Sequence, residues 1–141
     1  MSSAKVKWIG GKQFVGIDST SHSVVLSTAD EGVGMKPSEL LLVALAACSS
    51  VDVVEIMSKK RTPLQFLEVS ASGEQDADPP WTFRKIHLTY RTRGKGIQEK
   101  DIARAIQLSE EKYCSVASTL RGVAEITTSY EVLPEEPESG L

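Results

Sequence analysis

The fold of this chain is decided by one stretch, Lys36-Pro37-Ser38-Glu39-Leu40-Leu41-Leu42-Val43-Ala44-Leu45-Ala46-Ala47-Cys48. Proline is favoured at the first position of a helix, because its missing N–H would have no partner there. The apolar pattern continues to Met57, and the basic run Lys59–Arg61 then suits the negative end of a helix dipole ahead of Pro63. The sequence therefore predicts a long helix from Pro37 to about Met57.

The first half of this predicted helix is apolar nearly all round, and such a helix is buried on several sides. A single small fold has difficulty covering every side of it. We therefore expect a homodimer in which two such helices pack side by side, each flanked by sheet. The alternative is a monomer in which the helix is simply central.

The residues before the helix predict a three-stranded meander. Two apolar segments, 6–8 and 14–17, flank the turn pair Gly10-Gly11, and residues 19–23 form a second turn before the segment 24–26.

The residues after the helix predict two strands, a helix, a short helix and a last strand. The strands are Leu64–Ala71 and Phe83–Arg91, and the short helix begins at Ser115 as its N-cap and ends at Gly122, before the strand Ala124–Leu133. In the first of these helices the uncharged residues of one stripe fall at helical spacing: Ile102, Ala105, Ile106, Ser109 and Tyr113.

The expected fold class is therefore α/β (α+β), with the order βββ-α-ββ-αα-β and a long buried central helix. We expect residues 1–133 to form one domain and the acidic residues 134–141 to form a disordered tail.

Composition excludes two classes of function. The chain has 141 residues, of which 40% are hydrophobic and 25% charged, and its net charge of −3 offers no basic field for nucleic acid. Its first twelve residues lack the apolar core of a signal peptide, and the run Leu40–Cys48 is about half as long as a membrane span. We expect a cytoplasmic protein that binds neither nucleic acid nor membrane.

The two cysteines, Cys48 and Cys114, are the sharpest candidates for chemistry. In a reducing cytosol such a pair is either catalytic or consists of small hydrophobic side chains packed in the core. Helix dipoles favour Cys114 as the more acidic thiol, because it precedes a predicted helix, whereas apolar burial raises the pKa of a cysteine such as Cys48. The chain lacks the CxxC or HxxxH spacing that would join His22 and His87 to these thiols in a zinc site, so we expect no metal and no cofactor.

The helix start Pro37–Leu41, the segment Ala44–Cys48 and the second cysteine in Tyr113-Cys114-Ser115-Val116 resemble the OsmC/Ohr family of osmotically induced and organic hydroperoxide resistance proteins. The resemblance covers most of the chain and is nearest to an OsmC-like subgroup of uncertain function. It implies an intertwined α/β homodimer with two active sites at its interface, where a cysteine pair reduces organic hydroperoxides.

The resemblance also implies roles for particular residues. Cys48 matches the cysteine that attacks the O–O bond, and Cys114 matches the resolving cysteine that condenses with the resulting sulfenic acid. A dithiol reductant then restores both thiols.

In the family's peroxidases an Arg and a Glu activate the attacking cysteine. Lys12 is the nearest match to that Arg. Ser38 stands at the position of the Glu, ten residues before Cys48, and Glu39 follows it. Nine residues of helix place Glu39 about 13.5 Å from Cys48 along the axis and about half a turn out of phase, so a bent helix or a partner subunit would have to bring them together.

Plainer readings remain open for both residues. Glu39 could serve only the helix dipole, and Lys12 could be a solvated hairpin residue. The alternative function is then a non-catalytic OsmC-like protein that binds a small molecule and lacks the activating pair.

Overall fold

The structure is a computed structural model that describes residues 1–137. Within this range three strands are followed by a long helix, two strands, a helix, a π-helical turn, a short helix and a last strand, which confirms the predicted order. The chain divides into two compact units, Met1–Leu41 and Leu42–Leu141, and each is described by itself. The mixed α+β class is also confirmed.

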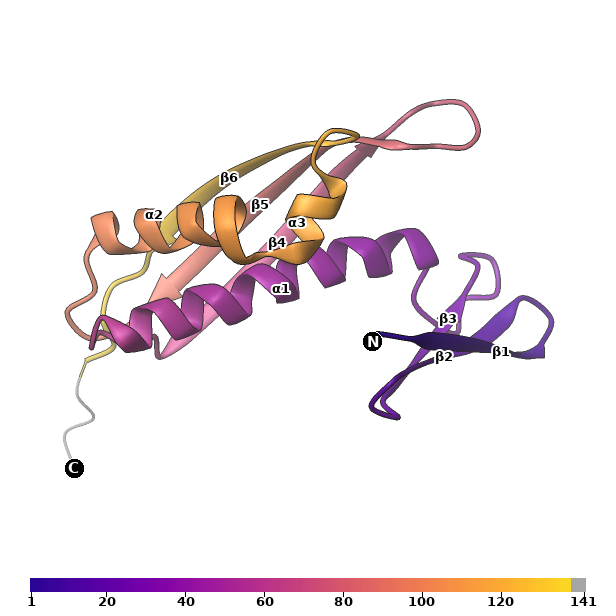
Figure 1. The fold of residues 1–141 in the computed structure, drawn as a ribbon, viewed down its shortest axis with the longest axis horizontal. Helices are drawn as coiled ribbons and strands as arrows, with labels where there is room; N and C mark the ends of the chain where they lie inside the picture. The colour runs from indigo at the N-terminus through magenta and orange to yellow at the C-terminus, as the bar shows by residue number, and fades with distance from the viewer. Residues whose placement is uncertain (138–141) are drawn as a thin grey trace. The chain divides into compact units, whose positions relative to one another are not determined.

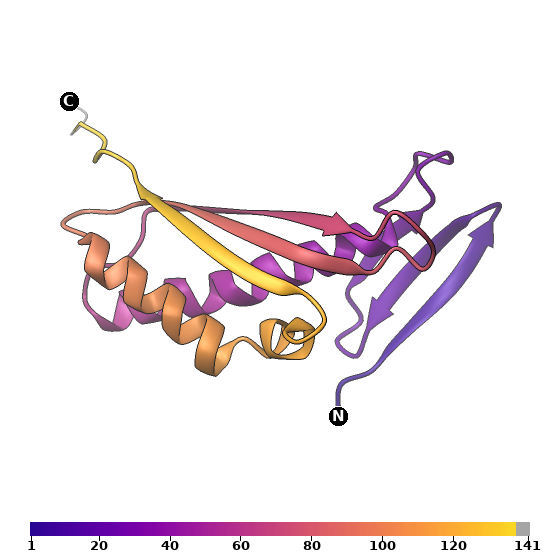
Figure 2. The ribbon, with the colours of Figure 1, turned by 90° about the horizontal axis from the view of Figure 1, so that it is seen from above.

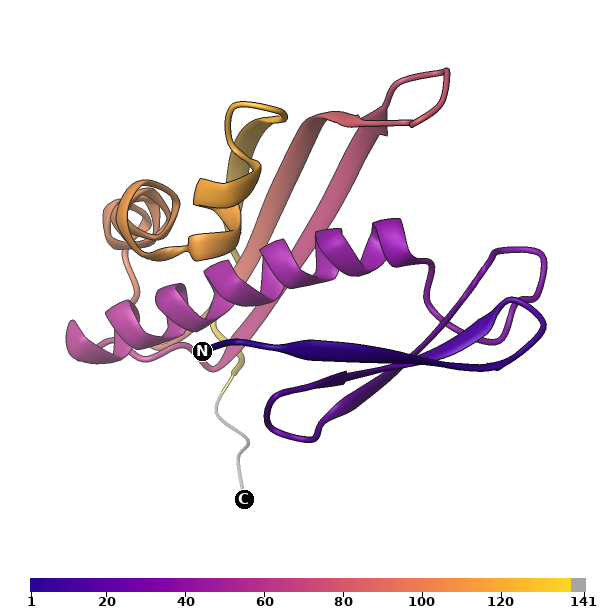
Figure 3. The same ribbon diagram turned by 45° about the vertical axis from the view of Figure 1, so that its right-hand side comes forward.

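The first unit contains a three-stranded antiparallel sheet of β1 (Ala4–Gly10), β2 (Gln13–Asp18) and β3 (Ser23–Ser27), drawn in indigo in Figure 3. Trp8 lies opposite Phe14 in the register of β1 and β2. The hairpin between them turns at Gly10 and Gly11, whose φ angles of 116° and 53° favour glycine. The predicted meander is therefore confirmed.

Both faces of this first sheet carry exposed apolar side chains. Val6 and Trp8 lie on one face, with 62% and 70% of their surface exposed, and Val25 is exposed on the other. Among the described residues of this unit, only Leu26 is a buried large apolar side chain. The first sheet therefore has little core of its own.

The second unit contains β4 (Phe66–Gln75), β5 (Phe83–Arg93) and β6 (Glu125–Val132) in that spatial order. β4 runs antiparallel to β5, and β6 runs parallel to it. A parallel pair needs a long crossover, which α2 (Glu99–Leu108) and α3 (Ser115–Leu120) provide. These helices and α1 (Pro37–Lys59) lie on one face of the sheet (Figures 1 and 2).

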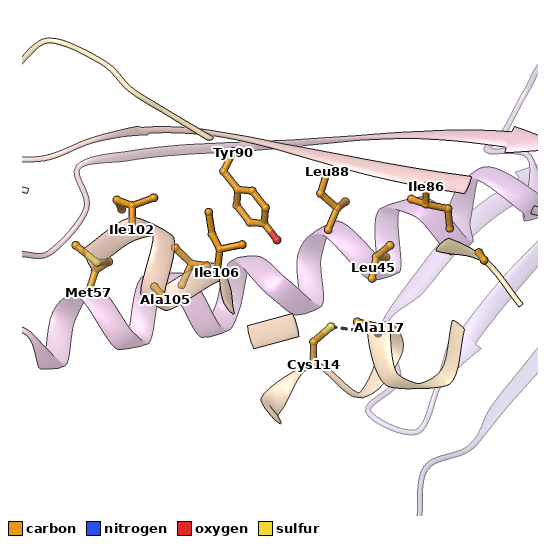
Figure 4. Packing of buried hydrophobic residues seen from close by; sticks show 12 residues of the cluster. Leu45, Met57, Ile86, Leu88, Tyr90, Ile102, Ala105, Ile106, Cys114 and Ala117 are labelled. Atoms are coloured by element: carbon orange, nitrogen blue, oxygen red, sulfur yellow. Dashed lines mark hydrogen bonds between the residues drawn. The ribbon is translucent and has the colours of Figure 1, made fainter. Parts of the chain in front are cut away.

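The core of the second unit lies between α1, α2 and the sheet (Figure 4). α1 contributes residues at every fourth position, which form one stripe along the helix. β5 contributes alternate residues from its inner face, and α2 contributes one apolar side. The buried residues of these three elements are Leu45, Ser49, Val53, Met57, Ile86, Leu88, Tyr90, Thr92, Ile102, Ala105 and Ile106.

α1 is covered on one side only within the described chain. Val43, Val51 and Val54 point away from the core stripe and are 46%, 64% and 47% exposed. By length and composition alone the helix is long and apolar enough to cross a membrane. Its buried stripe nevertheless packs in the core as a helix of a globular domain does.

The segment between α2 and α3 differs from the predicted continuous helix. The α-helix stops at Leu108, and Ser109–Tyr113 forms a π-helical turn, η1, which holds more residues per turn than an α-helix. Ser109 stays on the buried stripe as predicted. Tyr113, predicted on the same stripe, is rotated out and is exposed, so that part of the prediction is wrong.

Arg93 holds the segment that follows β6. It donates to the carbonyl oxygen of Pro134 at 3.1 Å and pairs with Glu136 at 3.1 Å. The predicted disordered tail, residues 134–141, lies partly outside the described residues, which end at 137. Both that prediction and the single domain of residues 1–133 stay predictions.

Candidate functional site

Cys48 and Cys114 are both free thiols in the second unit. Cys48 lies on α1 and is half-buried, and Cys114 is buried within the core against which Cys48 packs. Cys114 is the N-cap of α3, and its Sγ accepts a hydrogen bond from the N–H of Ala117 at 3.3 Å (Figure 4). The sequence predicts Ser115 as this cap, so the cap lies one residue earlier than expected.

The two thiols have opposite electrostatic environments. Burial acts to raise the pKa of Cys48, but hydrogen bonds from the backbone N–H of Val116, the Cys114 thiol and Ser115 outweigh it and lower that pKa. Burial, together with the neighbouring Cys48, raises the pKa of Cys114 to about 11 despite the N–H of Ala117. The ranking expected from helix dipoles alone is therefore reversed, because burial of Cys114 outweighs the favourable helix start.

A chain of buried polar side chains lies beside the cysteines. The hydroxyl oxygens of Tyr90 and Ser49 are 2.5 Å apart, those of Ser49 and Ser109 are 3.0 Å apart, and Ser109 donates to Asp52 at 2.8 Å. Burial raises the pKa of Tyr90 to about 12, so its hydroxyl keeps its proton at neutral pH. Sequence reasoning missed this series, although Ser49 falls at the spacing of the apolar stripe of α1 and could have been a signal.

A second polar feature lies on the side of α2 and η1 that faces β6. Gln107, Glu110, Arg121, Thr128 and Tyr130 are among the residues that line a cavity of about 780 Å³. Arg121 donates to the Glu110 carbonyl and pairs with its carboxylate at 3.8 Å. Burial raises the pKa of Glu110, and one of its oxygens is buried with no hydrogen-bond partner among the described residues.

Lys12 and Glu39, the predicted activating pair, belong to the first unit. Lys12 follows β1 and pairs with Asp30 at 2.7 Å, and this hydrogen bond raises the pKa of Lys12. Glu39 lies in the first turn of α1 and pairs with Lys36 at 3.5 Å. The structure therefore brings the two cysteines together, and the roles of Lys12 and Glu39 stay predictions.

The two histidines have hydroxyl partners rather than thiols. His22 contacts the Thr20 hydroxyl at 2.7 Å, and His87 contacts Thr127 and Ser129 at 2.7 and 2.8 Å. Within residues 1–137, no group of three or more His, Cys, Asp or Glu side chains is arranged to hold a metal ion.

Comparison with known proteins identifies relatives of nearly full length. Protein YhfA of Escherichia coli K12 is 36% identical over 130 residues, which cover 92% of this chain and 97% of that protein. The crystal structure of a hypothetical protein from Aquifex aeolicus is similar with a TM-score of 0.86 and 28% identity, over 97% of this chain and 98% of that one.

A more distant similarity concerns the fold alone. The organic hydroperoxide resistance protein OhrB of Bacillus subtilis has a TM-score of 0.64 at 15% identity, covering 93% of this chain and 98% of that one.

The family model described as OsmC-like protein matches residues 28–129, which include both cysteines and α1. The resemblance stated from the sequence is confirmed, and the chain belongs to the OsmC-like protein family.

Proposed function

We propose that this protein is a thiol-dependent peroxidase that reduces organic hydroperoxides through a Cys48–Cys114 thiol–disulfide cycle. The observation that carries the proposal is the pairing of two free thiols whose pKa values are shifted in opposite directions. A nucleophile must be a thiolate, and a resolving thiol must lie beside it. The similar OhrB protein is named for organic hydroperoxide resistance, and this name supports the choice of substrate.

The cycle has three balanced steps. The Cys48 thiolate attacks one oxygen of the hydroperoxide, the O–O bond breaks, and the departing alkoxide takes a proton to become the alcohol. The Cys114 sulfur then attacks the Cys48 sulfenic acid, forming the disulfide and releasing water. A dithiol reductant finally reduces this disulfide by thiol exchange and is itself oxidised to a disulfide. Because the cycle needs such a reductant, we place the protein in the cytoplasm.

We also propose that the active protein is a homodimer. Val43, Val51 and Val54 on α1, and Val6 and Trp8 on the first sheet, are apolar and exposed in the single chain. Exposed apolar surface of this kind is typical of an interface. A second copy would cover it, and the proposal assigns Lys12 and Glu39 as the cation and carboxylate that assist Cys48 in that assembly.

One observation favours the alternative, a non-catalytic binding protein. Lys12 already pairs with Asp30, and Glu39 pairs with Lys36. A lysine also cannot form the rigid two-point contact with a carboxylate that an arginine forms. If neither residue assists Cys48, the thiol pair could persist without rapid peroxide chemistry.

Mass spectrometry of the reduced protein after stoichiometric hydroperoxide tests the proposal. An organic hydroperoxide should remove two hydrogens from each subunit and link Cys48 to Cys114 within one chain, faster than hydrogen peroxide does. The Cys114→Ser variant should accumulate a sulfenic acid at Cys48 that a dimedone probe captures, and Cys48→Ser should not react. Parent protein that stays unmodified, or gains sulfinic acid without the disulfide, would favour the binding protein instead.

A further inference from the structure

The buried polar chain joins three elements of the second unit at one point. Ser49 belongs to α1, Tyr90 to β5, and Ser109 is the first residue of η1. All three are at most 1% exposed. Asp52, one turn after Ser49 on α1, is only partly buried and ends the chain.

The hydrogen bonds of this series converge on Ser109. Its hydroxyl donates to the Asp52 carboxylate at 2.8 Å and also lies in donor geometry to the Ser49 hydroxyl at 3.0 Å, so its single hydrogen faces two acceptors. Either hydroxyl of the contact between Ser49 and Tyr90 can be the donor. The three buried hydroxyls are thus joined in one series that ends on a carboxylate.

The same two serines are attached to the two cysteines. Ser49 follows Cys48 directly in α1. The backbone oxygen of Ser109 accepts a hydrogen bond from the N–H of Cys114 at 2.8 Å and so closes the π-helical turn. The side-chain contact between Ser49 and Ser109 is therefore a short bridge between the backbones that carry the two thiols.

We propose that the chain from Tyr90 through Ser49 and Ser109 to Asp52 positions Cys48 against Cys114 and thereby sets how readily the two thiols form a disulfide. Its members are positioning residues, because they act through the backbone of their neighbours. A disulfide tolerates only a narrow range of Cα and Cβ separations, so a small shift of η1 relative to α1 changes its stability. This inference extends the proposed thiol cycle to the residues that prepare it.

An apolar core would hold these elements together less specifically. Apolar contacts are non-directional and allow a helix to slide or rotate slightly at little cost, whereas hydrogen bonds constrain both distance and angle. The π-helical turn adds to this argument, because such turns occur frequently at functional sites.

The test is the equilibrium between the dithiol protein and oxidised glutathione, which yields the protein disulfide and two molecules of reduced glutathione. Each variant is equilibrated over a series of glutathione ratios, and the disulfide fraction is read by mass spectrometry after acid quench. Ser49→Ala and Ser109→Ala break the bridge itself, and Tyr90→Phe removes only the hydroxyl at the far end of the series. Ser50→Ala is the matched control, because the Ser50 hydroxyl bonds to Ala46 within α1 and is not part of the chain.

We expect the equilibrium constant for disulfide formation to fall about tenfold in Ser49→Ala and Ser109→Ala, the factor expected for one hydrogen bond of ordinary net strength, and less in Tyr90→Phe. Ser50→Ala should stay within about twofold of the parent, the usual error of such comparisons. Val53→Ala provides a second control, because it removes buried apolar atoms of α1 that take no part in the hydrogen-bonded series. It should lower the thermal midpoint of unfolding without changing the equilibrium constant for disulfide formation.

Two results would overturn the inference. One is an equilibrium constant for disulfide formation that stays within about twofold of the parent in Ser49→Ala, Ser109→Ala and Tyr90→Phe. A shift in these variants no larger than that of Val53→Ala, at the same loss of stability, would count equally against it. The other is a parent protein that forms no Cys48–Cys114 disulfide at any glutathione ratio. Neither measurement uses a hydroperoxide, so a parent that equilibrates with glutathione but ignores hydroperoxides contradicts the proposed function and leaves this inference standing.

Discussion

The two sheets of this protein differ in how much core each makes for itself. β4–β6 bury one face under α1, α2 and α3, and the fully buried residues Leu88 and Tyr90 belong to that face. β1–β3 leave apolar side chains exposed on both faces, with Trp8 at 70%. The difference teaches that the second unit builds a core beside the thiol pair, whereas the first unit leaves most of its apolar side chains exposed, and it is this surface that we propose a second copy covers.

The largest expected effect comes from breaking the completed core. Leu88→Ala removes a fully buried side chain from β5, and we expect it to lower the free energy of unfolding by about 3 kcal/mol because it leaves a cavity. Urea unfolding followed by circular dichroism measures this. Ser70→Ala, at an exposed position of β4, is the control and should change little. Equal effects of the two substitutions would mean that this sheet has no specific core.

The next effect concerns the two thiols within that core. At pH 8, a thiol of pKa about 11 is about one part in a thousand thiolate, whereas an ordinary thiol of pKa 9.0 is about one part in ten. The pKa of Cys48 is lowered from its ordinary value, so we expect iodoacetamide to alkylate Cys48 at least about tenfold faster than Cys114, because the stronger nucleophilicity of a thiolate of higher pKa offsets part of the difference in thiolate fraction. The ratio should shrink as the pH rises toward 11, because Cys114 then ionises as well.

Peptide mapping after timed alkylation measures both rates, and protein unfolded in urea is the control in which both thiols should react alike. Faster labelling of Cys114 in the native protein would mean that its helix start outweighs its burial after all.

A smaller effect is expected from the first sheet. Trp8→Thr removes the largest exposed apolar side chain of β1, and we expect it to weaken the proposed dimer by about 2 kcal/mol with little change in the unfolding of the second unit. Sedimentation velocity over a dilution series measures the dimer. Lys7→Thr, at the neighbouring position on the opposite face, is the matched control. A monodisperse monomer of the parent protein would contradict the dimer itself.

The smallest effect tests whether the first unit assists the thiols at all. Lys12→Arg and Ser38→Glu together restore the pattern of the family's peroxidases. We expect the double variant to oxidise Cys48 faster than the two single effects combined predict, by about 1 kcal/mol or about fivefold, because the arginine orients the thiolate only when a carboxylate holds it. Stopped-flow kinetics with an organic hydroperoxide measure this, with Lys7→Arg as control. A double variant no faster than the parent would favour the non-catalytic binding protein.

The sequence predicted the order of elements because their signals are local. Pro37, the glycine pair at 10–11 and the alternation of β5 each act through a few neighbouring residues. The π-helical turn escaped prediction because Ser109–Tyr113 has the composition of an ordinary helix. Its form accompanies contacts made with α1, of which the bond from Ser109 to Asp52 is the clearest.

The sequence predicted the two thiols of the candidate site as neighbours but not their electrostatics, and the roles of the site residues stay predictions. Cys48 and Cys114 were chosen from the sequence, and the structure brings them together. Which thiol is the more acidic depends on burial and on N–H groups that reach Cys48 from Val116 and Ser115, more than sixty residues away in the chain. No local pattern contains that information. The hydrogen-bonded series through Ser49 and Ser109 was also missed: the polar residues of α1 were a local signal, but their partners on β5 and η1 were not.

The sequence by itself determined the α+β class, the long helix from Pro37 and the family to which the chain belongs, because helix caps, turn glycines and hydrophobic periodicity act over a few residues. Only the tertiary structure decided that Cys114 is the buried and less acidic thiol and that three hydroxyl groups from separate elements meet between α1, β5 and η1. It also decided that, within residues 1–137, valines on the far side of α1 stay exposed. Burial and hydrogen bonding between distant segments depend on how the elements pack, and packing is a property of the whole fold.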